Sequence, residues 1–223
     1  MLDLIAAHRR ALTDALASLT AEQWRGPSLC AGWTPAHVLA HLTMPFRISA
    51  PEFLAGIERC GGDFTKFSDQ VAERDSSLPP SSLIAILAEN ADNPWEPPGG
   101  GLIGALSHDV IHGLDIAWPH GLRYDIPADA MRAVLDSVTS PLPPAVRSPL
   151  AADRARGDQD TTIFGFALAG IQVIATDLGW DAGTGAEVAG TGRDLLPLLA
   201  GRQIPVDRFR GSGTARLWSM AAQ

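Results

Sequence analysis

Two histidines, His108 and His112, stand four residues apart, and Asp115 follows three residues later. In an α-helix this spacing places the three side chains on one face, within reach of one another. Two neutral imidazoles in this arrangement can share a divalent metal ion, and a carboxylate one turn away can accept the other ring N–H of a ligand. The alternative is an ordinary pair on the helix surface or hydrogen-bonded in the core, because H-x-x-x-H alone is a loose pattern.

A metal site needs at least one further ligand from elsewhere in the chain. His37 and His41 form a second pair with a spacing of four. His41 has apolar neighbours on both sides, so we expect it to point into a helical bundle, whereas His37 lies nearer the helix start and is equally compatible with solvent. His8 stands beside Arg9 and Arg10 in a stretch expected to face solvent, and His120 follows a proline in a turn, so neither histidine is expected to take part in chemistry.

Other chemistries find little support in the sequence. It contains no G-x-S-x-G elbow, no P-loop lysine and no G-x-G-x-x-G between a strand and a helix. The two cysteines, Cys30 and Cys60, are too few for a disulfide scaffold or an all-cysteine zinc site. We expect Cys30 to be a packed thiol, since Arg25 is the one basic residue near it in sequence.

Composition and hydropathy argue against several classes of protein. The net charge of the 223 residues is −8, which argues against a nucleic acid as the main partner. Lys66 is the one lysine among 17 basic residues, and this arginine bias, with 22 glycines and 17 prolines, is typical of a GC-rich genome. The N-terminus lacks the order of a signal peptide, and the most apolar stretch, 163–175, is shorter than the roughly 20 residues of a membrane span. We expect a cytoplasmic protein with no membrane partner.

Apolar periodicity and capping residues predict where the elements that must position these histidines lie. Helices are predicted over 2–19, 34–46, 81–90, 102–118 and 127–139. Pro45 predicts a kink or an early end in the second of them, and residues 60–80 are predicted to be a long connection with short helical pieces. β-branched and aromatic residues predict strands over 161–168, 170–176 and 187–189, and a short helix is predicted over 194–200.

The change from helical to β-rich sequence predicts two domains. A proline-rich segment, 140–149, separates them, and we expect the boundary near residues 140–158. Residues 1–145 are then a helical bundle and residues 155–223 a small α/β domain. The predicted fold class is α+β.

Three sequence motifs, in order along the chain, resemble one known family. Residues 24–42, which read WRGPSLCAGWTPAHVLAHL, resemble the opening signature of the DinB-like, mycothiol-dependent maleylpyruvate isomerase family. Residues 108–115, HDVIHGLD, look like its second signature. Residues 173–180, 185–188 and 198–202 are similar to its C-terminal module, so the resemblance covers most of the chain.

The resemblance implies an antiparallel four-helix bundle that holds a divalent metal through His41, His108 and His112, with a C-terminal α/β domain that covers the site. Zn²⁺ is the first expectation for the ion and Ni²⁺ the second, since imidazole suits several divalent ions. The isomerase that gives the family its name has a glutamate where His108 stands. The three-histidine set is instead that of many DinB-like proteins, which argues against maleylpyruvate itself as the substrate.

Three protein ligands leave one position open, and a thiol entering it would be deprotonated at neutral pH. The expected activity is therefore metal- and mycothiol-dependent S-transfer to a small electrophile, or its isomerisation. Asp115 would orient a ligand, Trp95 would line the pocket, and Arg202 and Arg216 would bind an acidic substrate or the thiol's headgroup. The alternatives are a metal-dependent hydrolase and a non-catalytic metal- or small-molecule-binding protein. The chain is expected to be a monomer or a homodimer.

Overall fold

We describe the protein from a computed structural model, in which residues 1–140 and 168–221 are described. The chain divides into two compact units, Met1–Pro127 and Ala128–Gln223. Residues 161–167 of the strand predicted over 161–168, and all of the predicted boundary segment except residue 140, lie outside the described residues.

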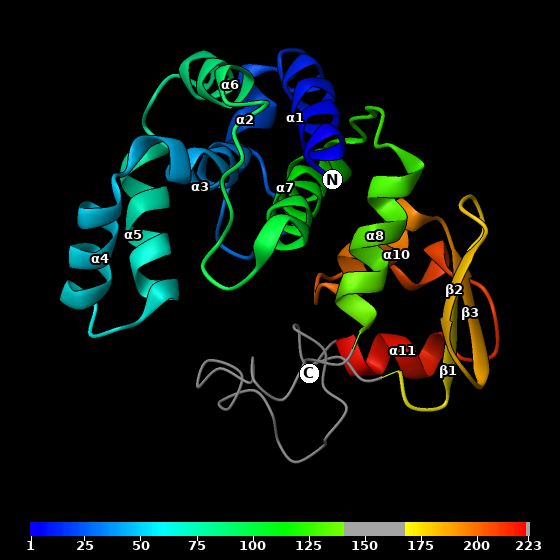
Figure 1. The fold of residues 1–223 in the computed structure, drawn as a ribbon. Helices are drawn as coiled ribbons and strands as arrows, with labels where there is room; N and C mark the ends of the chain where they lie inside the picture. The colour runs from blue at the N-terminus through cyan, green and yellow to red at the C-terminus, as the bar shows by residue number, and fades with distance from the viewer. Residues whose placement is uncertain (141–167, 222–223) are drawn as a thin grey trace. The chain divides into compact units, whose positions relative to one another are not determined.

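The first unit is helical, and its four-helix bundle agrees with the prediction. The elements of this unit are α1 (Leu2–Leu16), α2 (Ala21–Arg25), α3 (Pro35–Arg47), α4 (Ala50–Arg59), α5 (Phe64–Asp75), α6 (Pro80–Glu89), α7 (Gly101–Ala117) and the 3₁₀ turn η1 (Trp118–His120). Helices α1 and α3 each pack against both α6 and α7, and these four helices form the bundle (Figure 1). All four contribute to one apolar core, whose buried members include Leu12, Leu16, Leu39, Leu42, Leu83, Leu87 and Ile116. Removing this surface from water drives the helices together.

The segment after α3 differs from the prediction. It forms two helices, α4 and α5, where α4 was not predicted and residues 60–80 were expected to be mostly connection. Helix α3 also continues two residues beyond Pro45. Both new helices carry a side-chain cap, since Ser49 accepts the N–H of Glu52 and Asp63 accepts the N–H of Lys66. Helix α5 packs against both α4 and α3 (Figure 1).

The second unit begins one helix earlier than the sequence indicates. Helix α8 (Ala128–Thr139) was assigned to a first domain spanning 1–145, but the structure groups it with the sheet. The reason is that α8 makes its contacts there: Trp180 Nε1 donates to Asp136 at 2.7 Å, and Arg132 donates to the Leu178 carbonyl at 2.8 and 2.9 Å.

Among the residues that the structure describes, the sheet has three strands in the order β2-β1-β3. These are β1 (Ile171–Ala175), β2 (Trp180–Gly183) and β3 (Ala186–Gly190); they are followed by α10 (Gly192–Leu199), the turn η3 (Val206–Arg208) and α11 (Thr214–Ala221). Strand β1 pairs antiparallel with β2 and parallel with β3. The predicted β1, β3 and α10 are confirmed, whereas β2 and α11 were not predicted. The turn into β3 requires glycine at Gly185, where φ is +125° and a Cβ would lie 2.3 Å from the Gly170 carbonyl oxygen.

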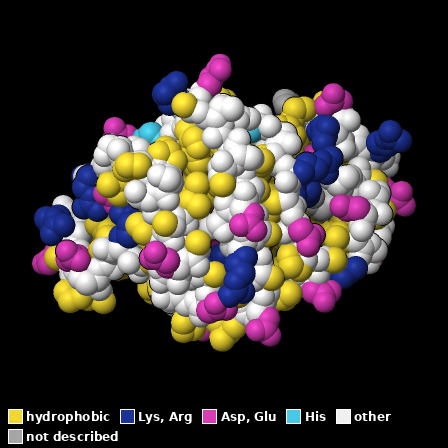
Figure 2. Space-filling model, turned by 90° about the horizontal axis from the view of Figure 1, so that it is seen from above, with side chains coloured by type: hydrophobic (Ala, Val, Ile, Leu, Met, Phe, Trp, Pro, Cys, Tyr) yellow, Lys and Arg dark blue, Asp and Glu magenta, His cyan; other side chains and the backbone are white. Residues whose placement is uncertain are grey.

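The charged side chains are mixed on the face shown in Figure 2. Acidic and basic groups are interspersed there among apolar and uncharged atoms. The net charge of −8 is therefore not gathered into one acidic patch on this face.

Candidate functional site

The first unit brings together the three histidines predicted as metal ligands. His41 lies on α3, and His108 and His112 lie one turn apart on α7. Their ring centroids are 4.8 to 5.1 Å apart, and one ring nitrogen from each lies within 4.8 Å of the others. His41 is buried, and the other two are partly buried. The contact between α3 and α7 in the bundle therefore sets the cluster.

Each of the three rings is held through its Nδ1 atom. His41 Nδ1 is 2.9 Å from the hydroxyl of Ser68, which lies on α5. His108 Nδ1 is 3.1 Å from an oxygen of Asp109, and His112 Nδ1 is 2.8 Å from an oxygen of Asp115. A hydrogen bond at Nδ1 fixes the ring and leaves Nε2 as the atom able to bind an ion.

The facing Nε2 atoms suit a cation. Those of His41 and His108 are 3.1 Å apart. When both Nδ1 atoms carry the proton, two lone pairs face each other, and a cation between them replaces repulsion with attraction. Ligands about 2.0–2.1 Å from a tetrahedral zinc ion would be separated by roughly 3.3 Å, close to this spacing. The donor set and the described geometry therefore fit a divalent ion.

The electrostatics of the cluster favour a neutral imidazole at His41. Burial lowers the pKa of His41 well below 6.5, the charges of His112 and His108 lower it further, and Asp115 opposes them. Burial alone would raise the pKa of Asp109, but the hydrogen bond with His108 and the nearby charges of His108 and Arg9 bring it below 3.8. Metal binding requires deprotonated ligands, so His41 needs no proton release at neutral pH.

Two indole rings border the histidines. The ring of Trp33 lies 5.4 Å from that of His41, and the ring of Trp95 lies 5.5 Å from that of His108. Trp95 was predicted to line the pocket, and it contacts one of the predicted ligands. Trp33 belongs to the first sequence motif but was not predicted to lie at the site. Apolar walls of this kind limit water access to a site.

Cys30 also lies at the cluster, although it was expected to be a packed thiol. Its sulfur donates to an oxygen of Asp115 at 3.1 Å and lies 3.9 Å from His112 Nδ1. Asp115 is fully buried, and its backbone carbonyl accepts the N–H of Leu29 at 3.0 Å. The loop before α3 is thereby tied to α7 beside His112.

Arg9 is buried, although its stretch of the chain was expected to face solvent. Its side chain is fully buried, and its Nε donates to Asp109 at 2.6 Å. Its burial could have been predicted from its spacing, because it lies on one helical stripe with Ile5, Leu12 and Leu16. All four residues are buried. Ser68 could not be found in this way, since its helix was expected to be mostly connection.

The remaining histidines stay outside the cluster. His37 bonds Thr34 at 2.7 Å and Glu73 at 2.9 Å. His8 is buried but bonds the Tyr124 hydroxyl at 3.1 Å. His120 follows α7 in η1 and is not part of the three-histidine group.

Arg202 and Arg216 belong to the second unit. Arg202 donates to the Ala200 carbonyl at 2.9 Å, and the guanidinium of Arg216 lies beside Gly170. Their predicted role in binding an acidic group stays a prediction.

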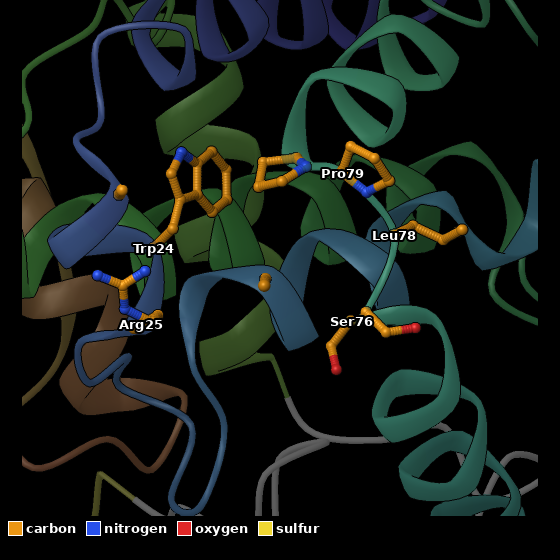
Figure 3. A pocket seen from close by; sticks show the side chains of 9 residues that line it. Trp24, Arg25, Ser76, Leu78 and Pro79 are labelled. Carbon is orange, nitrogen blue, oxygen red and sulfur yellow. The ribbon is translucent and has the colours of Figure 1, made fainter.

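A hollow of about 470 Å³ opens elsewhere on the first unit (Figure 3). It is lined by Ala21, Trp24, Arg25, Ala36 and residues 76–80. In Figure 3 the indole of Trp24 and the ring of Pro79 both lie in the upper part of the view. None of the predicted site residues lines this hollow, so it is not the pocket of the histidine cluster.

A comparison with protein families agrees with the first of the three motifs. Residues 5–93 match the family model described as the mycothiol maleylpyruvate isomerase N-terminal domain. The predicted family resemblance is thus confirmed for this part of the chain, which includes His41. No curated protein matches the chain.

The fold is similar to crystal structures of a mycothiol-dependent maleylpyruvate isomerase. A histidine-to-alanine mutant of that enzyme matches with a TM-score of 0.57 at 16% identity, covering 96% of this chain and 92% of the other. A second structure of the isomerase matches with a TM-score of 0.52 at the same identity and coverage. At this identity the likeness shows the fold. In the part of this chain that is described, no helix is both long and apolar enough to span a membrane.

Proposed function

Starting from the match of residues 5–93 to the mycothiol maleylpyruvate isomerase N-terminal domain, we propose that the chain is a divalent-metal- and mycothiol-dependent enzyme. It would transfer the thiol sulfur to a small electrophile, or isomerise that electrophile. The observation that carries the proposal is the convergence of His41, His108 and His112, each with Nδ1 already hydrogen-bonded.

The three Nε2 atoms would hold the ion, with Zn²⁺ as the first expectation and Ni²⁺ the second. A divalent ion with three protein ligands and an open position lowers the pKa of a thiol, so that the thiolate forms at neutral pH. Asp115 accepts the Nδ1–H of His112 and keeps that ring in place. The rings of Trp33 and Trp95 would limit the access of water, which competes with the thiol.

The nature of the substrate follows in part from the ligand set. His108 stands where the maleylpyruvate isomerase is expected to have a glutamate, so a substrate other than maleylpyruvate is proposed. Arg202 and Arg216 are proposed to bind a carboxylate of the substrate or the polar headgroup of mycothiol. Arginine suits this role because its planar fork pairs with carboxylates.

The proposed setting is the cytoplasm of a mycothiol-producing actinobacterium, as a monomer or a homodimer. The arginine-rich composition with a single lysine supports such a GC-rich source. Mycothiol is a low-molecular-weight thiol of those cells.

The test is thiol consumption with a panel of small electrophiles, with and without mycothiol, using wild-type protein loaded with Zn²⁺. Turnover that requires both thiol and metal supports the proposal. Metal-dependent turnover without thiol would favour a hydrolase, and tight metal binding with no turnover would favour a binding protein. Either of these results overturns the thiol-dependent assignment.

A further inference from the structure

We infer that Arg9 is a positioning residue that fixes the ring of His108 and the indole of Trp95 through a single guanidinium. The inference rests on the proposed function, because it concerns residues placed at the same site. Arg9 lies on α1, whereas His108 lies on α7 and Trp95 lies in the loop between α6 and α7.

One arm of the guanidinium reaches the predicted ligand. Arg9 Nε donates to Asp109 Oδ2 at 2.6 Å, and the other oxygen of Asp109 is 3.1 Å from His108 Nδ1. Both Arg9 and Asp109 are almost completely excluded from solvent, so the ion pair is screened little. Arg9 therefore orients the carboxylate that orients His108.

The other arm reaches the loop that carries Trp95. Arg9 Nη1 donates to the carbonyl oxygens of Asn90 at 2.8 Å and Asn93 at 2.9 Å, just beyond the C-terminal end of α6. The side chain of Asn93 then accepts the backbone N–H of Trp95 at 3.0 Å. A cation at a helix C-terminus also interacts favourably with the helix dipole.

The two arms meet again at the site, because the indole of Trp95 lies 5.5 Å from the ring of His108 in an edge-on contact. The route from Arg9 through Asp109 to His108 and the route through Asn93 to Trp95 form a closed ring of contacts. A displacement of the guanidinium would move both groups together.

Stability alone explains Arg9 poorly. Its Nη2 is buried and makes no hydrogen bond with the described residues, and the guanidinium lies 5.1 Å from the Phe46 ring. Burying a charge with an unused donor costs free energy. Well-packed apolar residues can often replace a buried ion pair without loss of stability. The forked shape of arginine, which serves Asp109 and two carbonyls at once, is what the position uses.

The neighbouring Arg10 offers a matched control. It also extends from α1 to the α6–α7 loop, where it pairs with Asp92, but both side chains are largely exposed. An exposed pair contributes little and does not touch the histidines. Arg10→Met removes one arginine from the same helix without cutting either arm.

The experiment uses Co²⁺ as the metal probe and ¹⁹F NMR of protein carrying 5-fluorotryptophan, with the Trp95 signal assigned among the six tryptophans through Trp95→Phe. We expect Arg9→Met to weaken Co²⁺ binding by about tenfold or more and to shift or broaden the Trp95 signal of the metal-free protein. Arg10→Met should leave both as in wild type. An Arg9→Met variant that folds and keeps both readouts unchanged overturns the inference.

Two milder variants keep the test decisive if Arg9→Met does not fold. Asn93→Ala removes the hydrogen bond to Trp95 and one to the Asn90 side chain, and leaves the contact between Arg9 and Asp109 in place. The Trp95 signal should therefore move while Co²⁺ affinity stays within about twofold of wild type. Arg9→Lys keeps the charge but not the fork, so it should restore Co²⁺ affinity more than the Trp95 signal. An unmoved Trp95 signal in both variants also overturns the inference.

The Trp95 readout separates this inference from the proposed function. A wild-type protein that binds no Co²⁺ contradicts the metal-dependent enzyme, whereas the Trp95 signal of the metal-free variants still decides whether Arg9 positions the indole.

Discussion

Asp109 and Asp115 do the same task at two places on α7, since each carboxylate binds the Nδ1 of a neighbouring histidine. Their other partners differ, and His108 and Arg9 bind different oxygens of Asp109. His112 and Cys30 bind the same oxygen of Asp115. Asp109 receives the guanidinium of Arg9 at 2.6 Å, whereas Asp115 receives the thiol of Cys30 at 3.1 Å. Both carboxylates are almost fully buried.

The difference teaches that orienting a ligand and stabilising the fold can be separated. A buried carboxylate opposite a guanidinium leaves a buried charge behind when it is removed. A carboxylate opposite a thiol leaves only a weak neutral donor and an imidazole N–H. We therefore expect the two positions to have similar effects on metal binding and different effects on stability.

The largest effect on metal binding should come from removing a histidine, because both carboxylates act by orienting a histidine. His112→Ala should lower Zn²⁺ affinity by more than about 100-fold, since loss of a ligand exceeds the roughly 10–100-fold cost of losing its supporting partner. His37→Ala is the control, because His37 lies on α3 four residues before His41 but bonds Thr34 and Glu73. Elemental analysis and competition with a chelator measure the change; equal metal content in the two variants would remove His112 from the site.

The second effect compares the carboxylates directly. Asp109→Ala should lower the free energy of unfolding by about 3–5 kcal/mol, because it leaves the Arg9 charge buried without its partner. Asp115→Ala should cost about 1–3 kcal/mol and lower Zn²⁺ affinity by roughly 10–100-fold. Urea denaturation of the metal-free variants measures the first quantity, and metal competition the second. A smaller stability loss for Asp109→Ala than for Asp115→Ala would reverse the comparison.

The third effect is a dependence on pH. The folded-state pKa of His41 is below its ordinary value of 6.5, so the unfolded chain takes up a proton first as the pH falls. The free energy of unfolding of the metal-free protein should therefore decrease below pH 6.5, with His41 contributing up to about 1.4 kcal/mol per pH unit. The lowered pKa of Asp109 has the same sign but acts only below 3.8.

The part of this pH dependence that His41 contributes can be measured by comparing wild type with a His41 variant. Urea denaturation from pH 7.5 to 5 should show a shallower decrease for His41→Gln than for wild type. Parallel curves for the two proteins would mean that another group carries the effect.

The smallest effect should come from the thiol. Cys30→Ser keeps a donor for Asp115 and should change the free energy of unfolding by less than about 0.5 kcal/mol, whereas Cys30→Val should lower it by about 1 kcal/mol. Denaturation of the two metal-free variants side by side checks this. If Ser and Val behave alike, the contact with Asp115 contributes nothing measurable.

Much of the cluster could be predicted because its residues follow helical spacing. His108, His112 and Asp115 lie within one helix, where the distance between side chains follows from their separation in sequence. His41 came from a family motif and from apolar neighbours, since no local rule relates α3 to α7. The bundle could be predicted from apolar stripes, because each stripe is visible in the sequence of its own helix, whichever helix it packs against.

The supporting residues were harder to predict for physical reasons. Arg9 looked like a surface residue because arginine is seldom buried, although its place on the apolar stripe was visible. Ser68 lies on α5, a helix with few apolar residues, and it is a polar member of the buried face that includes Phe67 and Val71. The approach of Cys30 to Asp115 depends on how the loop before α3 meets α7, and sequence separation contains no such information.

Helix α5 has a consequence for anyone who would reduce this protein to a minimal scaffold. The four bundle helices hold all three histidines, so a shortened chain without the α4–α5 hairpin would keep every proposed ligand. It would lose Ser68, and with it the hydroxyl at 2.9 Å from His41 Nδ1. The smallest unit that retains the ring orientation is thus a five-helix one, and the hairpin is a place where the site can be adjusted without replacing a ligand.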